Sequence, residues 1–206
     1  MAKRLYRDAG IVCSDHVIAS RKAVIAGDLI DRPYVIKPLN EGSSVGVRIV
    51  TDDADKSGFT EADWPFGDTV MVERYIPGRE ITVAVMGDRA LGVTEIRPTS
   101  GFYDYTAKYT EGVAEHLIPA PLSAEVYNRA MSASLAAHKA LGCRGVSRAD
   151  LRYDDATGGA DSVYLLEINT QPGMTPLSLV PEIAAYAGID FMNLVTWMVE
   201  HAACDG

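Results

Sequence analysis

The sequence predicts an α+β fold in which most strands pair antiparallel. Strand-like apolar runs occur in pairs around short glycine-containing turns, as antiparallel neighbours require. Helical spacing of apolar residues dominates in one central stretch and in the C-terminal tail. Because neither signal covers the whole chain, we expect a mixture of hairpins and packed helices.

The composition is that of a folded globular protein. The chain has 206 residues, of which 48% are hydrophobic and 23% charged, which is close to the average for soluble domains. This length allows one large domain or two small lobes with a real core and excludes a disulfide-stapled miniprotein. A formal net charge of −9 disfavours a nucleic-acid partner, since phosphate backbones attract basic surfaces.

The sequence has no sign of membrane insertion or export. No apolar run approaches the roughly 20 residues that a spanning helix needs, and Met1–Gly10 lacks the apolar stretch of a signal peptide. The three cysteines, Cys13, Cys143 and Cys204, have no CxxC spacing and suit reduced thiols better than a disulfide or zinc site. We therefore expect a cytoplasmic protein.

The N-terminal region predicts one short helix followed by strands. A helix over residues 3–10 ends at Gly10, and the apolar run 11–18 has the composition of a strand. Residues 34–38 and 47–50 predict two further strands. The acidic stretch 51–68 predicts a surface excursion with at most one short helix and little chemistry.

The middle of the chain predicts a hairpin, a loop and a helix. Residues 69–75 form a strand, and two further strands meet across a tight turn at Gly87. Residues 98–110 lack any sustained period, which indicates either a long ordered loop of the kind that often carries function or a partly mobile lid. Ser123 caps a helix that ends at Gly142.

The C-terminal third predicts a second hairpin and two helices. Strands over 145–154 and 162–169 flank a glycine-containing turn at 155–161. Helical spacing then covers residues 177–187 and 191–202.

This second hairpin carries the strongest chemical signal. If its turn is symmetric about the two adjacent glycines, Asp150 lies opposite Glu167 and Arg148 lies opposite Asn169, all on one face. Two carboxylates and an amide oxygen suit Mg²⁺ or Mn²⁺, which take further ligands from nucleotide phosphates. The alternative is a solvated sheet face on which Arg148 pairs with the acids.

Two segments in the first half have the makings of a nucleotide site. The loop EGSSVG at 41–46 offers backbone N–H groups and hydroxyls to a phosphate, with Lys37 just before it. The loop lacks the P-loop pattern, and an ordinary turn explains it equally well. Glu73 ends a strand near Ile76 and could accept from an exocyclic amine beside a flat base, although a surface strand end is the simpler alternative.

The remaining candidates are less specific. Lys108 and Tyr109 could reach a phosphate and a hydroxyl, or could be solvated loop residues. Gly173 allows a close backbone approach to a ligand, and Ser178 begins a helix whose N-terminus attracts anions, or simply caps it. The histidines have no ligand spacing and no GxSxG elbow is present, so hydrolase and zinc chemistry are disfavoured.

Together these segments resemble the D-alanine–D-alanine ligases of the ATP-grasp superfamily. The matching segments, in family order, are YVIKPLNEGSSVGVRIV, VERYIPGREITVAV, FYDYTAKY and SRADLRYD…YLLEINTQPGMTPLSLVP. The resemblance implies an ATP-grasp fold with two α+β lobes, residues 1–78 and 79–206, whose mostly antiparallel sheets sandwich the nucleotide.

The resemblance also implies roles for individual residues. Lys37 and Lys108 would bind ATP phosphates, Glu73 the adenine and Glu80 the ribose. The full set implied for ATP is Lys37, Ser44, Glu73, Arg74, Ile76, Glu80 and Lys108. Arg74 and Tyr75 replace the family's frequent Lys-Trp pair, so at these positions only backbone contacts carry over.

The implied metal and catalytic residues lie further along the chain. Two Mg²⁺ ions, or Mn²⁺ in their place, would be held by Asp150, Glu167 and Asn169. The first D-alanine would be oriented by Ser43 and Tyr109, the oxyanion stabilised by Arg148 and the Gly173 N–H, and the second D-alanine's carboxylate held by Ser178 and Leu179.

The implied reaction joins two D-alanines through an acyl phosphate, for peptidoglycan precursors and so for cell wall synthesis. Tyr109 favours the dipeptide product over a depsipeptide. Three alternatives remain open: a protein that binds Mg-ATP without catalysis, another ATP-grasp carboxylate–amine ligase, and a structural interaction protein.

The family's members are about half as long again and begin with a separate α/β domain. On this resemblance the chain is expected to be a truncated form whose first-substrate pocket is incomplete. The resemblance allows a homodimer.

Overall fold

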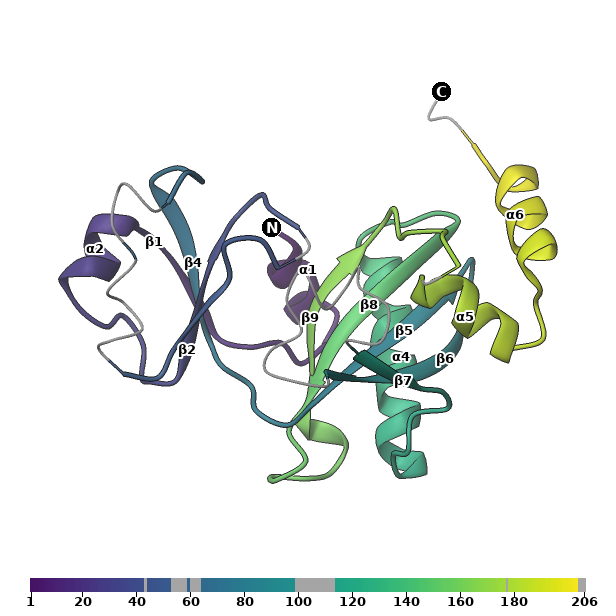
Figure 1. Ribbon diagram of the computed structural model, residues 1–206, viewed down its shortest axis with the longest axis horizontal. Coiled ribbons are helices and arrows are strands. Elements are labelled where there is room, and N and C mark those ends of the chain that lie inside the picture. The colour runs from purple at the N-terminus through teal and green to yellow at the C-terminus, as the bar shows by residue number, and fades with distance from the viewer. Residues whose placement is uncertain (43, 53–58, 60–63, 99–113, 177, 204–206) are drawn as a thin grey trace. The chain divides into compact units, whose positions relative to one another are not determined.

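The computed structural model describes residues 1–42, 44–52, 59, 64–98, 114–176 and 178–203 (Figure 1). By their contacts these residues form two compact units. The larger unit contains Met1–Cys13 with the described residues of 77–98 and 114–203, and the smaller unit contains the described residues of Ser14–Ile76. Helices and antiparallel sheets build both units, which confirms the predicted α+β class.

The predicted lobes divided the chain after residue 78, whereas the contacts change at Pro77 and assign the first 13 residues to the larger unit. The physical reason is Tyr6, which is 1% exposed and belongs to the larger unit's apolar core. Cys13 also contacts the larger unit, because it forms a parallel β-bridge with Leu165.

The described part of the smaller unit contains a four-stranded antiparallel sheet in the order β1-β4-β2-β3. Its strands are β1 (His16–Ser20), β2 (Tyr34–Pro38), β3 (Arg48–Val50) and β4 (Thr69–Arg74). The last three strands confirm the predicted ones to within about a residue, but β1 begins five residues later than predicted. A short helix, α2 (Arg21–Ala26), was not predicted, although Ser20 caps it by accepting from the Ala23 N–H.

Aromatic residues from the acidic stretch fill the core of the smaller unit. Phe59 and Trp64 are only 2% and 3% exposed, and their rings meet edge to face at 4.9 Å. The prediction of a surface excursion over 51–68 is therefore wrong for these two residues. Burying large aromatic side chains is favourable enough to draw an otherwise acidic segment onto the sheet.

In the described residues of the larger unit, five antiparallel strands form a sheet in the order β7-β6-β5-β8-β9. Its strands are β5 (Arg79–Met86), β6 (Arg89–Pro98), β7 (Ala114–Leu117), β8 (Val146–Tyr153) and β9 (Val163–Asn169). The predicted hairpins β5–β6 and β8–β9 are confirmed, with Gly87 at a φ of 61° in the first turn. Strand β7 and the 3-10 turn η2 (Ala160–Ser162) were not predicted.

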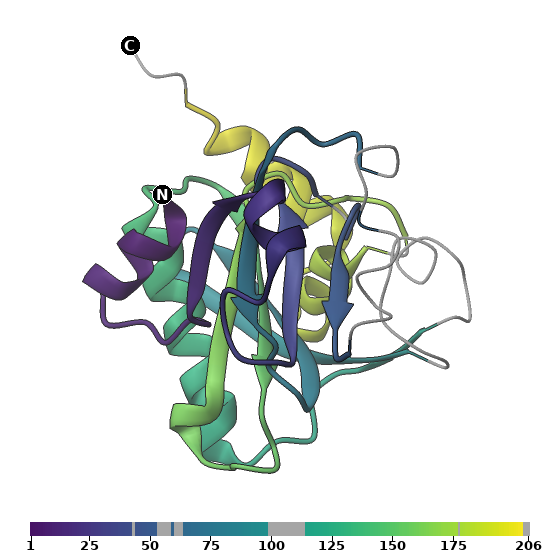
Figure 2. The ribbon, with the colours of Figure 1, turned by 90° about the vertical axis from the view of Figure 1, so that its left-hand side faces the viewer.

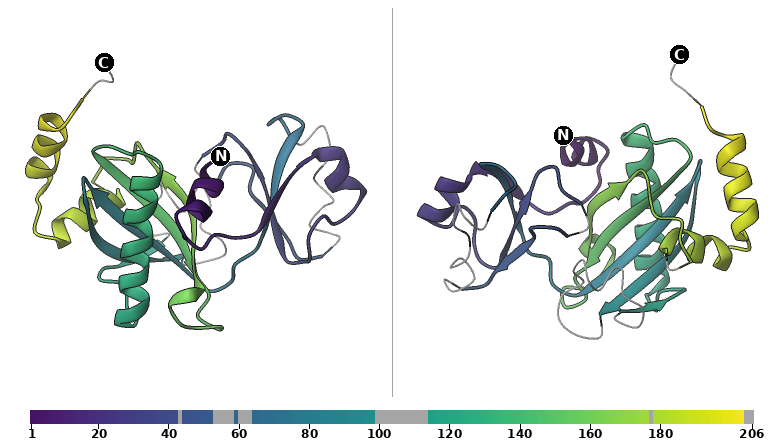
Figure 3. Two further views of the ribbon diagram at one scale, coloured as in Figure 1. Left: turned by 180° about the vertical axis from the view of Figure 1, so that it is seen from behind. Right: turned by 45° about the horizontal axis from the view of Figure 1, so that its top comes forward.

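Helices cover both faces of this sheet (Figures 1 and 3). The predicted central helix, α4 (Ala124–Ala140), begins at its Ser123 cap and packs Val126, Ala130 and Ala137 against one face. On the other face, α5 (Leu179–Tyr186) packs so closely that a Cβ on Gly92 would lie 3.4 Å from Ile183. Beyond it, α6 (Phe191–Glu200) rests on Gly87 through Trp197.

The N-terminal helix α1 (Ala2–Asp8) lies beside α4, as Figure 2 shows, and Gly10 follows it as predicted. The long loop predicted at 98–110 lies almost wholly outside the described residues. No helix in the described ranges is long and apolar enough to cross a membrane.

Candidate functional site

The register of the larger sheet gathers polar side chains on the face opposite α4. Asp150 pairs with Glu167 and Arg148 with Asn169 across β8 and β9, which confirms the facing pairs expected from the sequence. On the other side of β8, Thr82 of β5 pairs with Asp150. Directly paired residues share a face, so these five side chains form one polar row.

An irregularity in the hairpin produces this register. Near the turn Tyr153 pairs with Val163 and Leu151 with Leu165, and the pairing then shifts between Asp150 and Leu151. Because the shift leaves Leu166 as an extra residue in β9, Glu167 rather than Leu166 faces Asp150. A one-residue change of register moves every side chain to the opposite face, so this bulge puts Glu167 on the polar side.

Asp150 is held by two neighbours. The Arg148 guanidinium donates to both carboxylate oxygens, from Nε at 2.8 Å and from Nη2 at 2.7 Å. The Thr82 hydroxyl lies 2.9 Å from Asp150 Oδ1 and 2.9 Å from the Ala149 carbonyl. The pairing of Arg148 with an acid, which was the alternative to a metal site, is thus present on Asp150.

The same face supplies oxygen ligands for a divalent cation. Glu167 is exposed, and the Asn169 side-chain oxygen accepts from the Gln171 N–H at 3.0 Å. Two carboxylates and an amide oxygen are the hard donors that Mg²⁺ takes, so the residue types fit the predicted ion. Within the described residues, no group of three or more His, Cys, Asp or Glu side chains could hold a metal.

The segment before α5 is held by a hydrogen bond between two of its own residues. Ser178 stands at the N-cap of α5, but its side chain does not cap the helix. Instead Ser178 Oγ accepts from the Thr175 N–H at 2.9 Å. A Cβ on Gly173 would lie 2.8 Å from that oxygen, so only glycine fits there without a shift. Leu179, the other predicted acceptor residue, is 6% exposed.

In the smaller unit, the predicted adenine residue lies against the predicted phosphate residue. Lys37 Nζ lies 2.6 Å from Glu73 Oε1, and the Ser14 hydroxyl donates to Glu73 Oε2 at 3.2 Å. Glu73 is only 4% exposed, so this is a nearly buried carboxylate with a cation and a hydroxyl on it. Such a group is costly to bury without its partners.

The backbone N–H groups of the two residues after Glu73 donate to carbonyls of the same unit. The Arg74 N–H donates to the Asp15 carbonyl at 2.9 Å, and the Tyr75 N–H donates to the Pro33 carbonyl at 3.2 Å. Ile76 is 4% exposed. The strand end is therefore fixed in place.

The predicted phosphate loop is built from turns. The Val45 N–H donates to the Gly42 carbonyl at 3.0 Å, and Ser44 has a φ of 59°. A Cβ on Gly46 would lie 2.7 Å from the Phe66 ring, so this glycine is required by packing. Ser43, Lys108 and Tyr109 lie outside the described residues.

Three contacting residues escaped the sequence analysis: Ser14 on Glu73, Thr82 on Asp150, and Arg152, whose Nη1 lies 3.6 Å from the Glu80 carboxylate. Thr82 and Arg152 reach their partners through the pairing of β5 with β8, which lie more than 60 residues apart. The alternation of Arg148, Asp150 and Arg152 along one strand was the available signal.

Comparison with known proteins identifies the family of this chain. A family model described as "D-ala D-ala ligase C-terminus" matches residues 14–200. The chain belongs to the D-alanine–D-alanine ligase family. A D-alanine–D-alanine ligase of Rhodospirillum rubrum is 56% identical over 204 residues, which is 99% of this chain and 66% of that protein. One from Parvibaculum lavamentivorans is 54% identical over 99% of this chain and 67% of its own length.

Solved structures of the ligase family have the same fold. A D-alanine–D-alanine ligase of Bacillus anthracis matches with a TM-score of 0.78 at 34% identity, over 97% of this chain and 65% of that one. The structure of the Bacillus anthracis ligase complexed with ATP matches with a TM-score of 0.75 at 32% identity, over 97% of this chain and 64% of that one. The VanG D-Ala:D-Ser ligase of Enterococcus faecalis matches with a TM-score of 0.79 at 32% identity, over 97% of this chain and 59% of that one. The predicted ATP-grasp fold is thus confirmed, and the chain spans about two thirds of the length of these relatives.

Proposed function

We propose that this chain carries the nucleotide, metal and acceptor residues for ATP-dependent ligation of two D-alanines, in the cytoplasm and for peptidoglycan precursors. The observation that carries the proposal is the polar row of Thr82, Arg148, Asp150, Glu167 and Asn169 on one sheet face. It occurs in a chain 56% identical to a D-alanine–D-alanine ligase. Residues that suit metal-assisted phosphoryl transfer therefore coincide with family membership.

ATP is the proposed first substrate. Its adenine would be recognised at Glu73 and the backbone of Arg74 to Ile76, its ribose at Glu80, and its phosphates at Lys37, Ser44 and Lys108. The contact of 2.6 Å between Lys37 Nζ and Glu73 Oε1 supports this assignment, because the two side chains lie close enough for one molecule to touch both. A lysine adds a mobile positive charge to a phosphate without fixing its direction.

Asp150, Glu167 and Asn169 are the proposed ligands for Mg²⁺, with Mn²⁺ as an alternative. Bound there with ATP, the ion would neutralise charge on the phosphates. Arg148 already holds a positive charge against Asp150 in this structure. With a metal ion on Asp150, the Arg148 guanidinium would be free in part to interact with an anion.

The proposed chemistry has two steps. An oxygen of the first D-alanine's carboxylate attacks the terminal phosphorus of ATP, and ADP leaves, so a poor electrophile becomes an acyl phosphate. The amine of the second D-alanine then attacks the acyl carbon, loses a proton, and phosphate leaves as the peptide bond forms. Arg148 and the Gly173 N–H would stabilise the oxyanion in the second step.

The remaining substrate contacts follow the same assignment. Ser43 and Tyr109 would orient the first D-alanine, while Ser178 and Leu179 would hold the carboxylate of the second at the start of α5. A Cβ on Gly173 would lie 2.8 Å from Ser178 Oγ, so a glycine at this position suits a backbone N–H that approaches the substrate closely.

A second acceptor is supported by one comparison. The VanG structure, titled a D-Ala:D-Ser ligase, matches this chain with a TM-score of 0.79. D-serine is therefore the competing acceptor in the test of the proposal.

The test is ADP release by the purified chain in Mg-ATP, with and without millimolar D-alanine or D-serine, and with chromatography of the dipeptide. Ligation predicts release that depends on a D-amino acid and is abolished in Glu167→Gln. Glu200→Gln, an exposed change on α6, is the matched control and should behave as the parent chain. Mg-ATP binding without release would support the non-catalytic alternative instead, and no ATP binding would contradict the proposal.

A further inference from the structure

The strand β8 contributes one more charged residue to the polar face, beyond those proposed for the metal. Arg152 lies directly opposite Glu80 of β5 in the register, two residues beyond Asp150. Its side chain is 14% exposed and that of Glu80 is 17% exposed. A carboxylate this far from solvent depends on its neighbours for compensation.

Arg152 makes two contacts with the start of β5. Its Nη2 donates to the Gly78 carbonyl at 2.8 Å, and its Nη1 lies 3.6 Å from Glu80 Oε2. The planar guanidinium fixes its donors relative to one another. One side chain therefore holds both the backbone just before β5 and the carboxylate two residues later.

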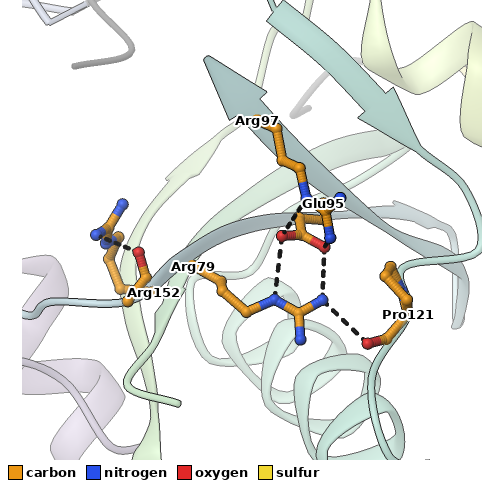
Figure 4. Close-up of polar contacts among 6 residues, drawn as sticks. Arg79, Glu95, Arg97, Pro121 and Arg152 are labelled. Carbon is orange, nitrogen blue, oxygen red and sulfur yellow. Dashed lines mark hydrogen bonds and ion pairs between the residues drawn. The ribbon is translucent and has the colours of Figure 1, made fainter. Parts of the chain in front are cut away.

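The same stretch is confined from other sides. A Cβ on Gly78 would collide with the Tyr153 carbonyl and would lie 2.9 Å from Asp155 Oδ1, so β8 presses directly on this residue. On the opposite face, Arg79 donates to Glu95 Oε1 at 3.1 Å and to the Pro121 carbonyl at 3.0 Å (Figure 4). Arg79 and Arg152 thus hold neighbouring residues of one short segment on its two faces.

We propose that Arg152 is a positioning residue for ribose recognition, because it orients the Glu80 carboxylate toward the hydroxyls of the nucleotide. The inference rests on the proposed function, in which Glu80 accepts from the ribose of ATP. A carboxylate has about four acceptor positions, so Glu80 can keep its contact with Arg152 and still accept from two hydroxyls. Arg152 itself touches no substrate in this account.

The proposal predicts a defect that depends on the ribose hydroxyls. Arg152→Met removes the guanidinium and keeps much of the apolar stem, so Glu80 loses its orientation while the fold keeps its packing. We expect the Kd for Mg-ATP to rise about threefold to tenfold, the usual scale for a charged hydrogen bond that is weakened. The Kd for 2′,3′-dideoxy-ATP, which has no hydroxyl for Glu80, should stay within about twofold of the parent value.

Four further variants test whether Arg152 acts through Glu80. Adding Arg152→Met to Glu80→Gln should change ATP affinity by less than about twofold, since residues that act through one another are not additive. Arg152→Lys keeps the charge and should give a Kd between those of the parent and Arg152→Met. Arg89→Met, an exposed arginine at the other end of the β5–β6 hairpin, is the control and should bind both nucleotides as the parent does.

Calorimetric titration of the full chain and its variants with both nucleotides decides between the outcomes. Loss of affinity for ATP alone supports the proposal. Equal losses for both nucleotides, or no loss for either, overturn it while leaving ATP binding intact. If the parent binds both nucleotides equally, Glu80 does not bind the ribose hydroxyls; this inference and the ribose assignment of Glu80 then fail, while ATP binding stands. If the parent binds no ATP, the proposed function fails and this inference fails with it.

Discussion

Arg148 and Asp150 form a two-point ion pair along a single strand, with Nε 2.8 Å and Nη2 2.7 Å from the two carboxylate oxygens. The two residues share a face because they lie two positions apart in β8. The pair joins a proposed oxyanion-binding residue to a proposed metal ligand. Charge at one of them therefore affects the other, and a cation that binds Asp150 competes directly with Arg148.

Thr82 supports this pair from the neighbouring strand, and its removal should weaken the site. The hydroxyl is fully buried and lies 2.9 Å from Asp150 Oδ1. Thr82→Val keeps the shape and deletes the hydrogen bond, so we expect the free energy of unfolding to fall by about 1–2 kcal/mol. Urea unfolding measures this change. Thr82→Ser keeps the hydroxyl and should lose less, and equal losses in both variants would attribute the effect to packing.

The ion pair of Lys37 with Glu73 predicts a coupled change in stability. Lys37→Met leaves Glu73, which is 4% exposed, with the Ser14 hydroxyl but without its cation. Because Lys37 is itself 20% exposed, we expect a loss of about 1–3 kcal/mol rather than the full cost of an unpaired buried charge. The double variant Lys37→Met with Glu73→Gln should recover part of the loss. Strictly additive effects in urea unfolding would show that the pair contributes nothing.

The sequence predicted best those parts of the fold that depend on neighbours along the chain. The period of α4, the Ser123 cap and the Gly87 turn are local signals, and each agrees with the structure. Phe59 and Trp64 were misjudged because an acidic segment can carry two aromatic residues to a distant sheet. Strand β7 was missed because only its pairing with β6 makes it a strand.

The candidate site shows the same division. A turn centred between Gly158 and Gly159 predicted that Asp150 faces Glu167. The pairs beside the turn are instead centred on Gly158, and the bulge in β9 restores the predicted pairing. The contacts of Thr82 and Arg152 depend on how β5 pairs with β8, and no local pattern sets that register. The roles of Thr82 and Arg152 could therefore be recognised only from the three-dimensional structure.

Glu95 predicts a specific loss of stability in acid. Burial alone would raise the pKa of Glu95, but hydrogen bonds from Arg79 and then Arg97 outweigh it and hold the pKa below the ordinary value of 4.5. The unfolded chain therefore takes up a proton more readily than the folded one. The stability that Glu95 provides is present above about pH 4.5 and is lost as the pH falls through the lowered pKa.

Glu95→Gln is the corresponding variant. At pH 7 it should be less stable than the parent chain by about 1–3 kcal/mol, because two arginines lose their shared carboxylate. This difference should shrink as the pH falls below 4.5, and urea unfolding at several pH values measures it. Arg89→Met, which alters an exposed charge on the same strand, should show a small difference that does not shrink. A constant gap for Glu95→Gln would contradict the assigned role of the carboxylate.

Tyr6 is expected to make the folded chain lose stability at high pH. Burial, followed by the nearby Cys143 and Glu167 charges, raises the pKa of Tyr6 from 10.0 to about 12. In this case the unfolded chain loses its proton first, so the stability from Tyr6 is complete below pH 10 and falls as the pH rises toward 12. A shift of about two pKa units corresponds to at most about 3 kcal/mol.

Tyr6→Phe removes the ionising group and keeps the ring in the core. The variant should be less stable than the parent chain by about 1 kcal/mol at pH 8, because it lacks the hydroxyl that interacts with the Ile168 backbone. Above pH 10 the parent should lose stability faster, so that the gap closes and then reverses. Urea unfolding at pH 8, 10 and 11.5 gives the two curves, and curves that stay parallel would mean that the phenol ionises equally well in the folded chain.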